Sequence, residues 1–193
     1  MDISINKSDT ENKIKLFVDS FGDSEKTVKE FFSCDGIITV TEYVGNRLAA
    51  MASLIPICAQ NASVLERIRG YYIYGVCVDK EYRGCGLFSA IMQKAEEYAE
   101  KEDADFVCLI PADRKLEATY RKWGYSIEIL NVHGKESSDK NIFIEASDFR
   151  EFAIPSEDAA GYQRMCGLMK VFNKKAFEPK DCEFAFGDFM GDI

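Results

Sequence analysis

Hydrophobic and polar positions in the first third of the chain predict two helices followed by a β-hairpin. Ser8 and Glu11 fit a capping box at the start of a helix that ends near Gly22. A second short helix follows, capped by Asp23 or Ser24. Two β-prone runs joined by a turn then predict a hairpin, over residues 36–43 and 48–59.

The middle of the chain alternates strands and helices. Residues 71–78 form a β-prone run interrupted by Gly75, which indicates a bulge or a close backbone approach. Apolar residues then recur at helical spacing as far as about Lys101. A short buried strand over 105–110 and a helix over 113–123 come next.

The last part of the chain is predicted to be mainly β-structure, and its signals weaken over residues 135–193. Strands are expected at 125–132, 142–146, 165–172 and 182–193. The order of elements predicts a mixed α/β (α+β) fold with a central sheet flanked by helices. We expect a single domain over 1–193, with 135–193 as its C-terminal β extension.

Composition excludes several classes of protein. Hydrophobic residues make up 47% of the 193 residues, which is enough for a substantial core. No apolar run reaches the roughly 18 residues that span a bilayer, and no signal-peptide pattern is present, so no membrane association is expected. The net charge of −9 argues against a nucleic-acid binder and is compatible with a cationic substrate.

The seven cysteines and the single histidine indicate a reduced protein with no bound metal. The cysteines form no C-x-x-C pair, and one histidine is too few for most zinc spacings. Cys77 and Cys108 lie inside apolar runs, where cysteine behaves as a small hydrophobic residue. A cytoplasmic protein is the simplest interpretation.

The segment "VDKEYRGCGLFSA", residues 78–90, carries the clearest chemical signal because it joins a predicted strand to a predicted helix. The first amides of a helix have no acceptor inside it, and the helix dipole makes them electropositive. Glycines let an anion approach the backbone, and an arginine reaches phosphate oxygens. We therefore predict that a pyrophosphate is bound by Arg83, Gly84, Cys85, Gly86, Leu87 and Phe88.

Two common phosphate motifs do not match this segment. A P-loop requires Gly-Lys-Ser/Thr after its first glycine. A dinucleotide fingerprint requires a small residue three positions after Gly86, and Ser89 occupies that position. It also requires an acidic residue that binds the ribose, and none is evident at the right distance.

The spacing instead resembles motif A of the GNAT superfamily, the acetyl-CoA-dependent N-acetyltransferases. That motif reads Arg/Gln-x-x-Gly-x-Gly/Ala and follows a strand that ends Val-x-x-x-Tyr. Val78, Tyr82, Arg83 and Gly86 match it. Phe88 stands where the family usually has Gly or Ala, so its bulky side chain has to turn away.

A second segment, "ATYRKWGY" at 118–125, resembles the part of the family in which a tyrosine precedes a Gly-aromatic pair by four residues. The strand, glycine turn, helix, strand and second helix also occur in the family's order. The resemblance is clear over 71–126 and implies the GNAT fold, with a mixed, twisted sheet.

The resemblance implies that an acetyl group moves from acetyl-CoA to a primary amine by direct attack in a ternary complex. Main-chain N–H groups freed by a bulge at Gly75 would bind the acetyl carbonyl and the pantetheine arm, at Val76, Cys77 and Val78. Tyr120 would be the general acid, because its unperturbed pKa of about 10 is close to that of a thiol.

Each assignment has an alternative. Gly75 could simply avoid a crowded neighbour, and Tyr120 could be a core residue on the apolar face of its helix. The base is open among Tyr72, Tyr74, Glu42 and water, and His133 lies in a polar loop where a solvated imidazole is expected.

The acceptor is expected to be a small-molecule or peptide amine, and the late aromatic residues could belong to the core, the acceptor site or a homodimer contact. The alternative function is a catalytically silent GNAT module that binds CoA as a regulatory ligand. An unrelated nucleotide-binding domain would prefer ATP or NAD instead.

Overall fold

This computed structural model describes most of the first two thirds of the chain and three shorter pieces beyond it. The described residues are 9–34, 36–61, 67–130, 142–146, 167–172 and 182–183. The predicted loop that contains His133 and most of the residues after 146 lie outside them.

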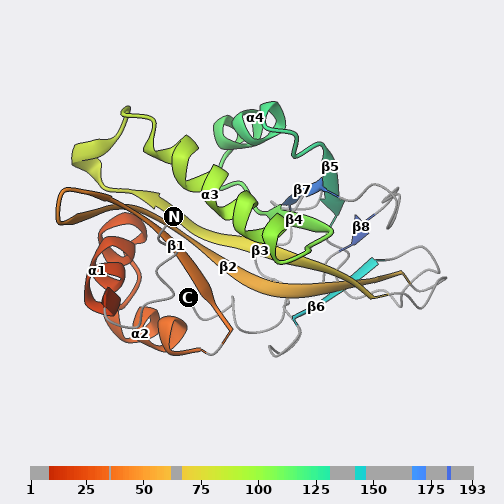
Figure 1. The fold of residues 1–193 in the computed structure, drawn as a ribbon, viewed down its shortest axis with the longest axis horizontal. Coiled ribbons are helices and arrows are strands. Elements are labelled where there is room, and N and C mark those ends of the chain that lie inside the picture. The colour runs from red at the N-terminus through yellow and green to blue at the C-terminus, as the bar shows by residue number, and fades with distance from the viewer. Residues whose placement is uncertain are drawn as a thin grey trace. The chain divides into compact units, whose positions relative to one another are not determined.

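Helices and strands follow one another along the described chain in the order that the hydrophobic pattern predicts (Figure 1). The helical elements are α1 (Thr10–Phe21), α2 (Glu25–Ser33), the 3-10 turn η2 (Lys80–Tyr82), α3 (Leu87–Lys101) and α4 (Arg114–Lys122). The strands are β1 (Ile38–Val44), β2 (Arg47–Asn61), β3 (Arg67–Val78), β4 (Phe106–Leu109), β5 (Ile127–Leu130), β6 (Ile142–Ala146), β7 (Gly167–Val171) and β8 (Cys182–Glu183).

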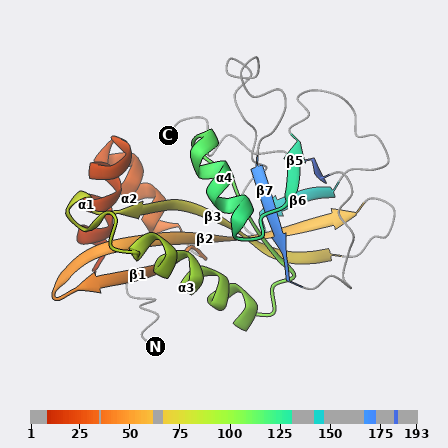
Figure 2. The same ribbon diagram turned by 90° about the horizontal axis from the view of Figure 1, so that it is seen from above.

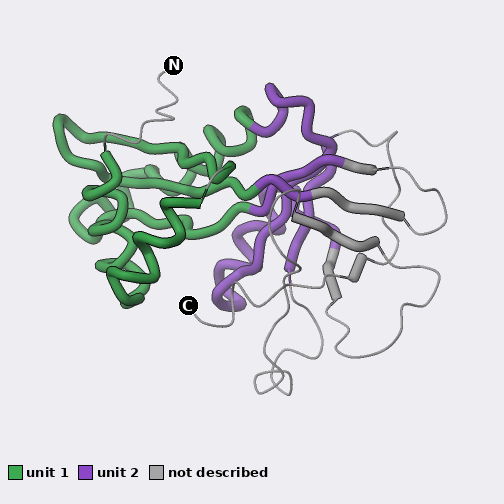
Figure 3. The backbone as a smooth tube through the Cα atoms, turned by 90° about the horizontal axis from the view of Figure 1, so that it is seen from below, with its two compact units in different colours: residues 1–55, 73–98, 193 green, residues 56–72, 99–192 purple. Residues whose placement is uncertain are grey.

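The chain divides into two compact units, shown in different colours in Figure 3. Unit 1 contains residues 1–55, 73–98 and 193, and unit 2 contains residues 56–72 and 99–192. The long strands β2 and β3 contribute to both units. One domain over the whole chain stays a prediction.

Unit 1 is a three-layer structure built on β1, β2 and β3. The first two strands form the predicted antiparallel hairpin, and β2 is hydrogen-bonded to β3. Helices α1 and α2 cover one face of these strands, and α3 lies on the other (Figures 1 and 2). Lys94 of α3 donates a hydrogen bond to the carbonyl of Thr41 in β1, at 3.1 Å, which fixes the helix over the hairpin.

The core of unit 1 gathers around Phe17 of α1. Its ring lies 5.8 Å from that of Tyr74 in β3 and 6.0 Å from that of Phe31 in α2, measured between centroids. The buried members of this cluster come from α1, α2, β2 and β3: Ile14, Leu16, Phe17, Val28, Leu48, Met51 and Cys77. Burial of this apolar area stabilises the packing of the two N-terminal helices on the strands.

Unit 2 is a mixed sheet. The N-terminal part of β3 pairs with β4 in parallel, β7 pairs antiparallel with both β4 and β5, and β5 pairs in parallel with β8. The C-terminal part of β2 pairs antiparallel with β6. All four residues of β4 are buried, so the prediction of a short buried strand there is confirmed.

Local capping signals set the helix ends. The Ser24 hydroxyl accepts the amide of Thr27 at 3.1 Å, and the Asp113 carboxylate accepts the amide of Leu116 at 2.7 Å. Gly124 follows α4 with φ +93°, which is the left-handed conformation expected of a C′ glycine. The predicted cap at Ser24 is therefore confirmed, whereas Ser8 lies outside the described residues.

Candidate active site

The connection from β3 to α3 is a tight turn in unit 1. After β3 ends at Val78, the Asp79 side chain caps η2 by accepting the amide of Glu81 at 3.0 Å. The next residue after η2 is Arg83, whose Nε donates back to the carbonyl of Val78 at 3.2 Å. This bond closes the turn, so that the chain is held in place just before the two glycines.

Gly84 and Gly86 adopt backbone conformations that other residues rarely take. Their φ angles are +81° and +80°. A Cβ built on either glycine would have no other atom within 4 Å among the described residues. The glycines are therefore required by backbone conformation, and the space above them is open to a ligand.

The turn leads directly into the first residues of α3. The amide of Ala90 donates to the carbonyl of Gly86 at 3.1 Å, so Gly86 occupies the capping position of the helix. Glycine has no side chain with which to cap the amides of the first turn, and they stay electropositive. Residues 83–86 are exposed and Leu87 and Phe88 are half-buried. This arrangement can bind an anion through main-chain N–H groups.

Strand β3 is irregular at Gly75, where φ is +61°. Side chains three residues apart in a regular strand face opposite sides, yet Tyr74 and Cys77 both pack on the cluster around Phe17. The alternation therefore breaks between them. A Cβ at Gly75 would also lie 2.5 Å from Cε2 of Phe17, so the strand irregularity and the crowded neighbour occur together at this position.

The three residues after Gly75 expose little side-chain chemistry. Burial raises the pKa of the Cys77 thiol to about 12, which leaves it protonated and unreactive at neutral pH. Val76 and Val78 are half-buried. The ladder between β3 and β4 comprises three residue pairs and ends at Tyr72. What this stretch offers a ligand is its main chain.

Tyr120 lies in α4, in unit 2, and is only 5% exposed. Burial raises the pKa of its hydroxyl to about 12. Its ring meets that of Tyr125 edge to face, with 5.7 Å between the centroids. The strand segment 76–78 and the turn segment 83–88, which are the predicted coenzyme-binding residues, both lie in unit 1. Tyr120, the predicted general acid, belongs to unit 2.

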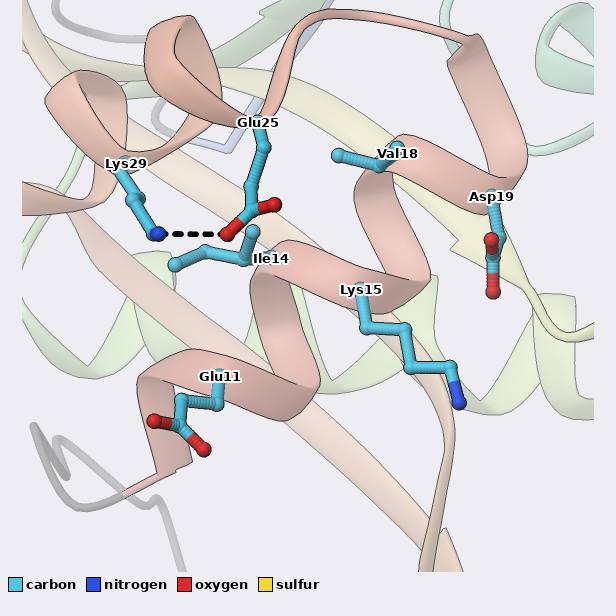
Figure 4. A pocket seen from close by; sticks show the side chains of 7 residues that line it. All are labelled: Glu11, Ile14, Lys15, Val18, Asp19, Glu25 and Lys29. Atoms are coloured by element: carbon cyan, nitrogen blue, oxygen red, sulfur yellow. Dashed lines mark ion pairs between the residues drawn. The ribbon is translucent and has the colours of Figure 1, made fainter.

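Helices α1 and α2 line a cavity of about 370 Å³ in unit 1 (Figure 4). Its walls carry carboxylates and ammonium groups together with a few apolar side chains: Glu11, Ile14, Lys15, Val18, Asp19, Glu25 and Lys29. Glu25 and Lys29 form an ion pair within α2. A lining of this kind suits a polar ligand.

A family model described as an acetyltransferase (GNAT) domain matches residues 3–128, which include the glycine turn and Tyr120. The chain belongs to the GNAT acetyltransferase family. The prediction that this sequence is a GNAT family member is therefore confirmed. No curated protein matches the chain by sequence.

Solved structures show that the fold is the GNAT fold, which confirms the prediction of a mixed sheet with helices. The GNAT family N-acetyltransferase YhbS from Escherichia coli, in complex with CoA, superposes with a TM-score of 0.64 at 12% identity, covering 95% of this chain and 87% of that one. The aminoglycoside antibiotic 6'-N-acetyltransferase from Acinetobacter haemolyticus gives 0.51 at 16% identity, covering 72% and 100%.

A longer protein shows the same fold over part of its length. The GCN5-related N-acetyltransferase from Kribbella flavida gives a TM-score of 0.53 at 23% identity, with 63% of this chain covered. The match covers 32% of the Kribbella flavida protein, so the present chain spans about a third of that protein's length.

The candidate bases of this GNAT protein differ in their surroundings. Glu42 forms an ion pair with Lys94, so its carboxylate is already engaged. Burial raises the pKa of Tyr74 to about 12, and Tyr72 is 5% exposed. Glu42 is the one carboxylic acid among the three, and its side chain is held by a lysine.

Neither a metal centre nor a membrane segment emerges from the described part of the chain. It contains no group of three or more His, Cys, Asp or Glu side chains that could hold a metal ion. None of its helices combines the length and the apolar character needed to cross a bilayer.

Sequence reasoning missed Arg47, which the structure places against the segment that leads into the glycine turn. Its guanidinium pairs with Asp79 and Glu81 and lies over the ring of Tyr82. In the sequence Arg47 is a charged residue at a hairpin turn. No neighbouring residue indicates that its side chain pairs with carboxylates more than thirty residues further along the chain.

Proposed function

We propose that this protein transfers the acetyl group of acetyl-CoA to a primary amine by direct attack in a ternary complex. The observation that carries the proposal is the turn at residues 83–88, where two left-handed glycines with open space at their Cβ positions lead directly into the start of α3. A diphosphate is the part of CoA that such a turn can bind. The E. coli neighbour of the same fold was solved with CoA.

In this proposal the main chain holds the coenzyme at two places. The amides of the turn, with the guanidinium of Arg83, bind the diphosphate. The main-chain N–H groups of Val76, Cys77 and Val78 bind the pantetheine arm and the acetyl carbonyl. The break in alternation at Gly75 supports this second role, because an irregular strand backbone is what a bulge that frees main-chain N–H groups requires.

The reaction forms a C–N bond and breaks a C–S bond, while the amine loses a proton and the sulfur gains one. The amine nitrogen attacks the thioester carbonyl, whose oxygen gains negative charge that main-chain N–H groups stabilise. The C–S bond then breaks, and the amine loses a proton to water or to a side chain. Tyr120 donates its proton to the departing sulfur as general acid. The products are an acetamide and CoA as the free thiol.

The raised pKa of Tyr120 bears on how this proton is given up. A hydroxyl with a pKa of about 12 lies some three to four units above a thiol near 8.5, so complete transfer costs about 5 kcal/mol. We therefore propose that Tyr120 first donates a hydrogen bond to the sulfur while negative charge develops on it. Its proton moves to the sulfur only as the C–S bond breaks, and the proton that the amine releases then restores the hydroxyl.

The acceptor is proposed to be a small-molecule or peptide amine. The net charge of −9 favours the approach of a cationic amine. One neighbour of the same fold is an aminoglycoside N-acetyltransferase, and aminoglycosides are small polyamines. A panel of diamines, polyamines, aminoglycosides and lysine peptides, offered with acetyl-CoA, tests the reaction. Release of free thiol together with an acetylated amine in the mass spectrum is the expected result, and thiol release without acetylated product would contradict it.

A CoA-binding module without catalysis is the second candidate function. The observation that favours it is the burial of Tyr120, which is 5% exposed and packs against Tyr125 as a core residue would. Tight binding of CoA with no acetylated product across the amine panel would support this candidate.

Cys85 offers a direct test of where the coenzyme binds, because it is a free, exposed cysteine inside the turn. We expect iodoacetamide to alkylate Cys85 at pH 8, and saturating acetyl-CoA to slow this reaction at least about tenfold, since a bound diphosphate covers the turn. Peptide mass spectrometry measures the rate at each cysteine.

Two of the other described cysteines are internal controls. Cys77, with its raised pKa, stays unmodified with or without ligand, and Cys34 reacts at a rate that acetyl-CoA does not change. NAD at the same concentration is expected to give no protection. A rate at Cys85 that acetyl-CoA leaves unaltered would remove the coenzyme from this turn.

A further inference from the structure

The guanidinium of Arg47, at the start of β2, contacts three side chains of the segment that precedes the glycine turn. Its Nη2 lies 2.8 Å from Oδ2 of Asp79, and its Nη1 pairs with the carboxylate of Glu81. Its Cζ lies 5.5 Å from the centroid of the Tyr82 ring, within the range of a cation–π contact. The Arg47 side chain thus contacts the N-cap residue of η2 and two of the three residues of η2 itself.

Asp79 links this segment to β2 a second time. Its amide donates to the carbonyl of Ala49 at 2.8 Å, and its carbonyl accepts the amide of Tyr82 at 2.9 Å. The register of β1 with β2 shifts at this point, so Ala49 is the extra residue of the bulge. The Asp79 side chain is only 16% exposed, whereas that of Arg47 is 49% exposed. The carboxylate of Asp79 is therefore the less hydrated partner.

These contacts act on the conformation of the turn more than on the stability of the fold. Half-exposed ion pairs contribute little to the free energy of folding. A ligand that binds a loop, however, loses affinity by the free energy needed to order that loop. The segment held by Arg47 runs directly into Arg83 and Gly84. The conformational freedom of this segment therefore determines whether the glycine turn already has its binding conformation before a ligand binds.

We propose that Arg47 is a positioning residue for the coenzyme, which holds residues 79–83 so that the glycine turn and the first amides of α3 meet the diphosphate of CoA. This inference rests on the proposed function, because it takes the turn to be the coenzyme site. Arg47 itself need not touch the ligand.

The test compares variants that change charge in opposite directions. Arg47→Met removes the guanidinium but keeps a long apolar stem, and we expect it to weaken CoA binding at least about fivefold in isothermal titration. Asp79→Asn removes a negative charge but keeps an oxygen that caps η2. If only the net charge mattered, Asp79→Asn would bind the CoA anion more tightly than the wild type. If the contact between Asp79 and Arg47 matters, Asp79→Asn binds CoA more weakly. We expect weaker binding by about two- to threefold.

Lys80→Met is the matched control, since Lys80 lies in η2 and is exposed, and its substitution removes one positive charge from the same turn. We expect its CoA affinity to stay within about twofold of the wild type at physiological ionic strength. Arg47→Lys, which keeps one charge but loses the planar fork, is expected to restore part of the affinity. If acetyl transfer is observed, the KM for acetyl-CoA rises in Arg47→Met while kcat at saturation is unchanged.

The outcomes separate this inference from the proposed function. Wild-type protein that does not bind CoA would contradict both. Wild-type binding with unchanged affinity in Arg47→Met, or tighter binding in Asp79→Asn, would overturn the positioning role alone. An equal loss of affinity in Lys80→Met and Arg47→Met would assign the effect to net charge. The double variant Arg47→Met/Asp79→Asn is expected to bind no more weakly than Arg47→Met, because both changes remove the same contact.

Discussion

Gly86→Val is expected to weaken CoA binding about a hundredfold while the protein stays folded. Gly86 has φ +80°, and a β-branched residue in this region is strained by about 1–2 kcal/mol or more, so the variant turn relaxes to another conformation. The coenzyme must then restore the original turn and also displace two methyl groups from the surface it approaches. Isothermal titration with CoA measures the loss, and urea unfolding measures the stability.

Gly22→Val is a closely matched control for this substitution. Gly22 has φ +84° at the end of α1, and a Cβ there would have no other atom within 4 Å among the described residues. The φ angle is therefore nearly the same, and Gly22 lies in the same unit but at the end of a different helix. We expect the two variants to lose similar free energy of unfolding, with CoA affinity changed only in Gly86→Val. A comparable loss of affinity in both would attribute the effect to general destabilisation.

Elements specified by neighbouring residues could be predicted from the sequence. Ser24 and Gly124 lie at helix ends where capping rules place them, and both adopt the expected geometry. The hairpin is confirmed as well, because its turn and its two β-prone runs are contiguous in the chain. The residues of the glycine turn were found in the same way, since a strand, two glycines and a helix follow one another without interruption.

Pairings between distant segments could not be predicted. Glu42 was considered as a base from its residue type, but whether it is available depends on Lys94, which lies on a helix that the hairpin pattern does not indicate as its neighbour. The order of strands in unit 2 is equally non-local, because β7 inserts between β4 and β5, which precede it in the chain. Such contacts are fixed by tertiary packing, which local propensity does not encode.

Gly75 shows how two explanations of one residue can both apply. Its positive φ breaks the alternation of β3, and the missing side chain lets Phe17 approach the strand. The ring of Phe17 occupies the space that a Cβ would need, so packing of α1 helps to keep the strand irregular. The core of unit 1 and the proposed pantetheine-binding amides therefore depend on the same residue.

Tyr120→Phe is expected to lower kcat by about a hundredfold, with no change in the Kd for CoA. The variant keeps the buried ring and its packing against Tyr125, and it removes only the hydroxyl that is proposed to donate to the leaving sulfur. With a pKa of about 12, the hydroxyl of the wild type stays protonated up to about pH 10, so kcat is not expected to fall on the alkaline side below that pH through loss of this proton. Steady-state kinetics with the best amine of the panel, from pH 6 to 10, measures both effects.

Tyr125→Phe is the matched control, because Tyr125 is also a buried tyrosine and its ring is the neighbour of the Tyr120 ring. We expect its kcat to remain within a fewfold of the wild type. Equal turnover in the wild type and Tyr120→Phe would place Tyr120 in the core and leave protonation of the thiolate to water. A loss of kcat that is the same in both variants would show that packing of the tyrosine pair matters, and not the Tyr120 proton. Only a loss confined to Tyr120→Phe, with CoA affinity retained, supports the hydroxyl as the group that donates to sulfur.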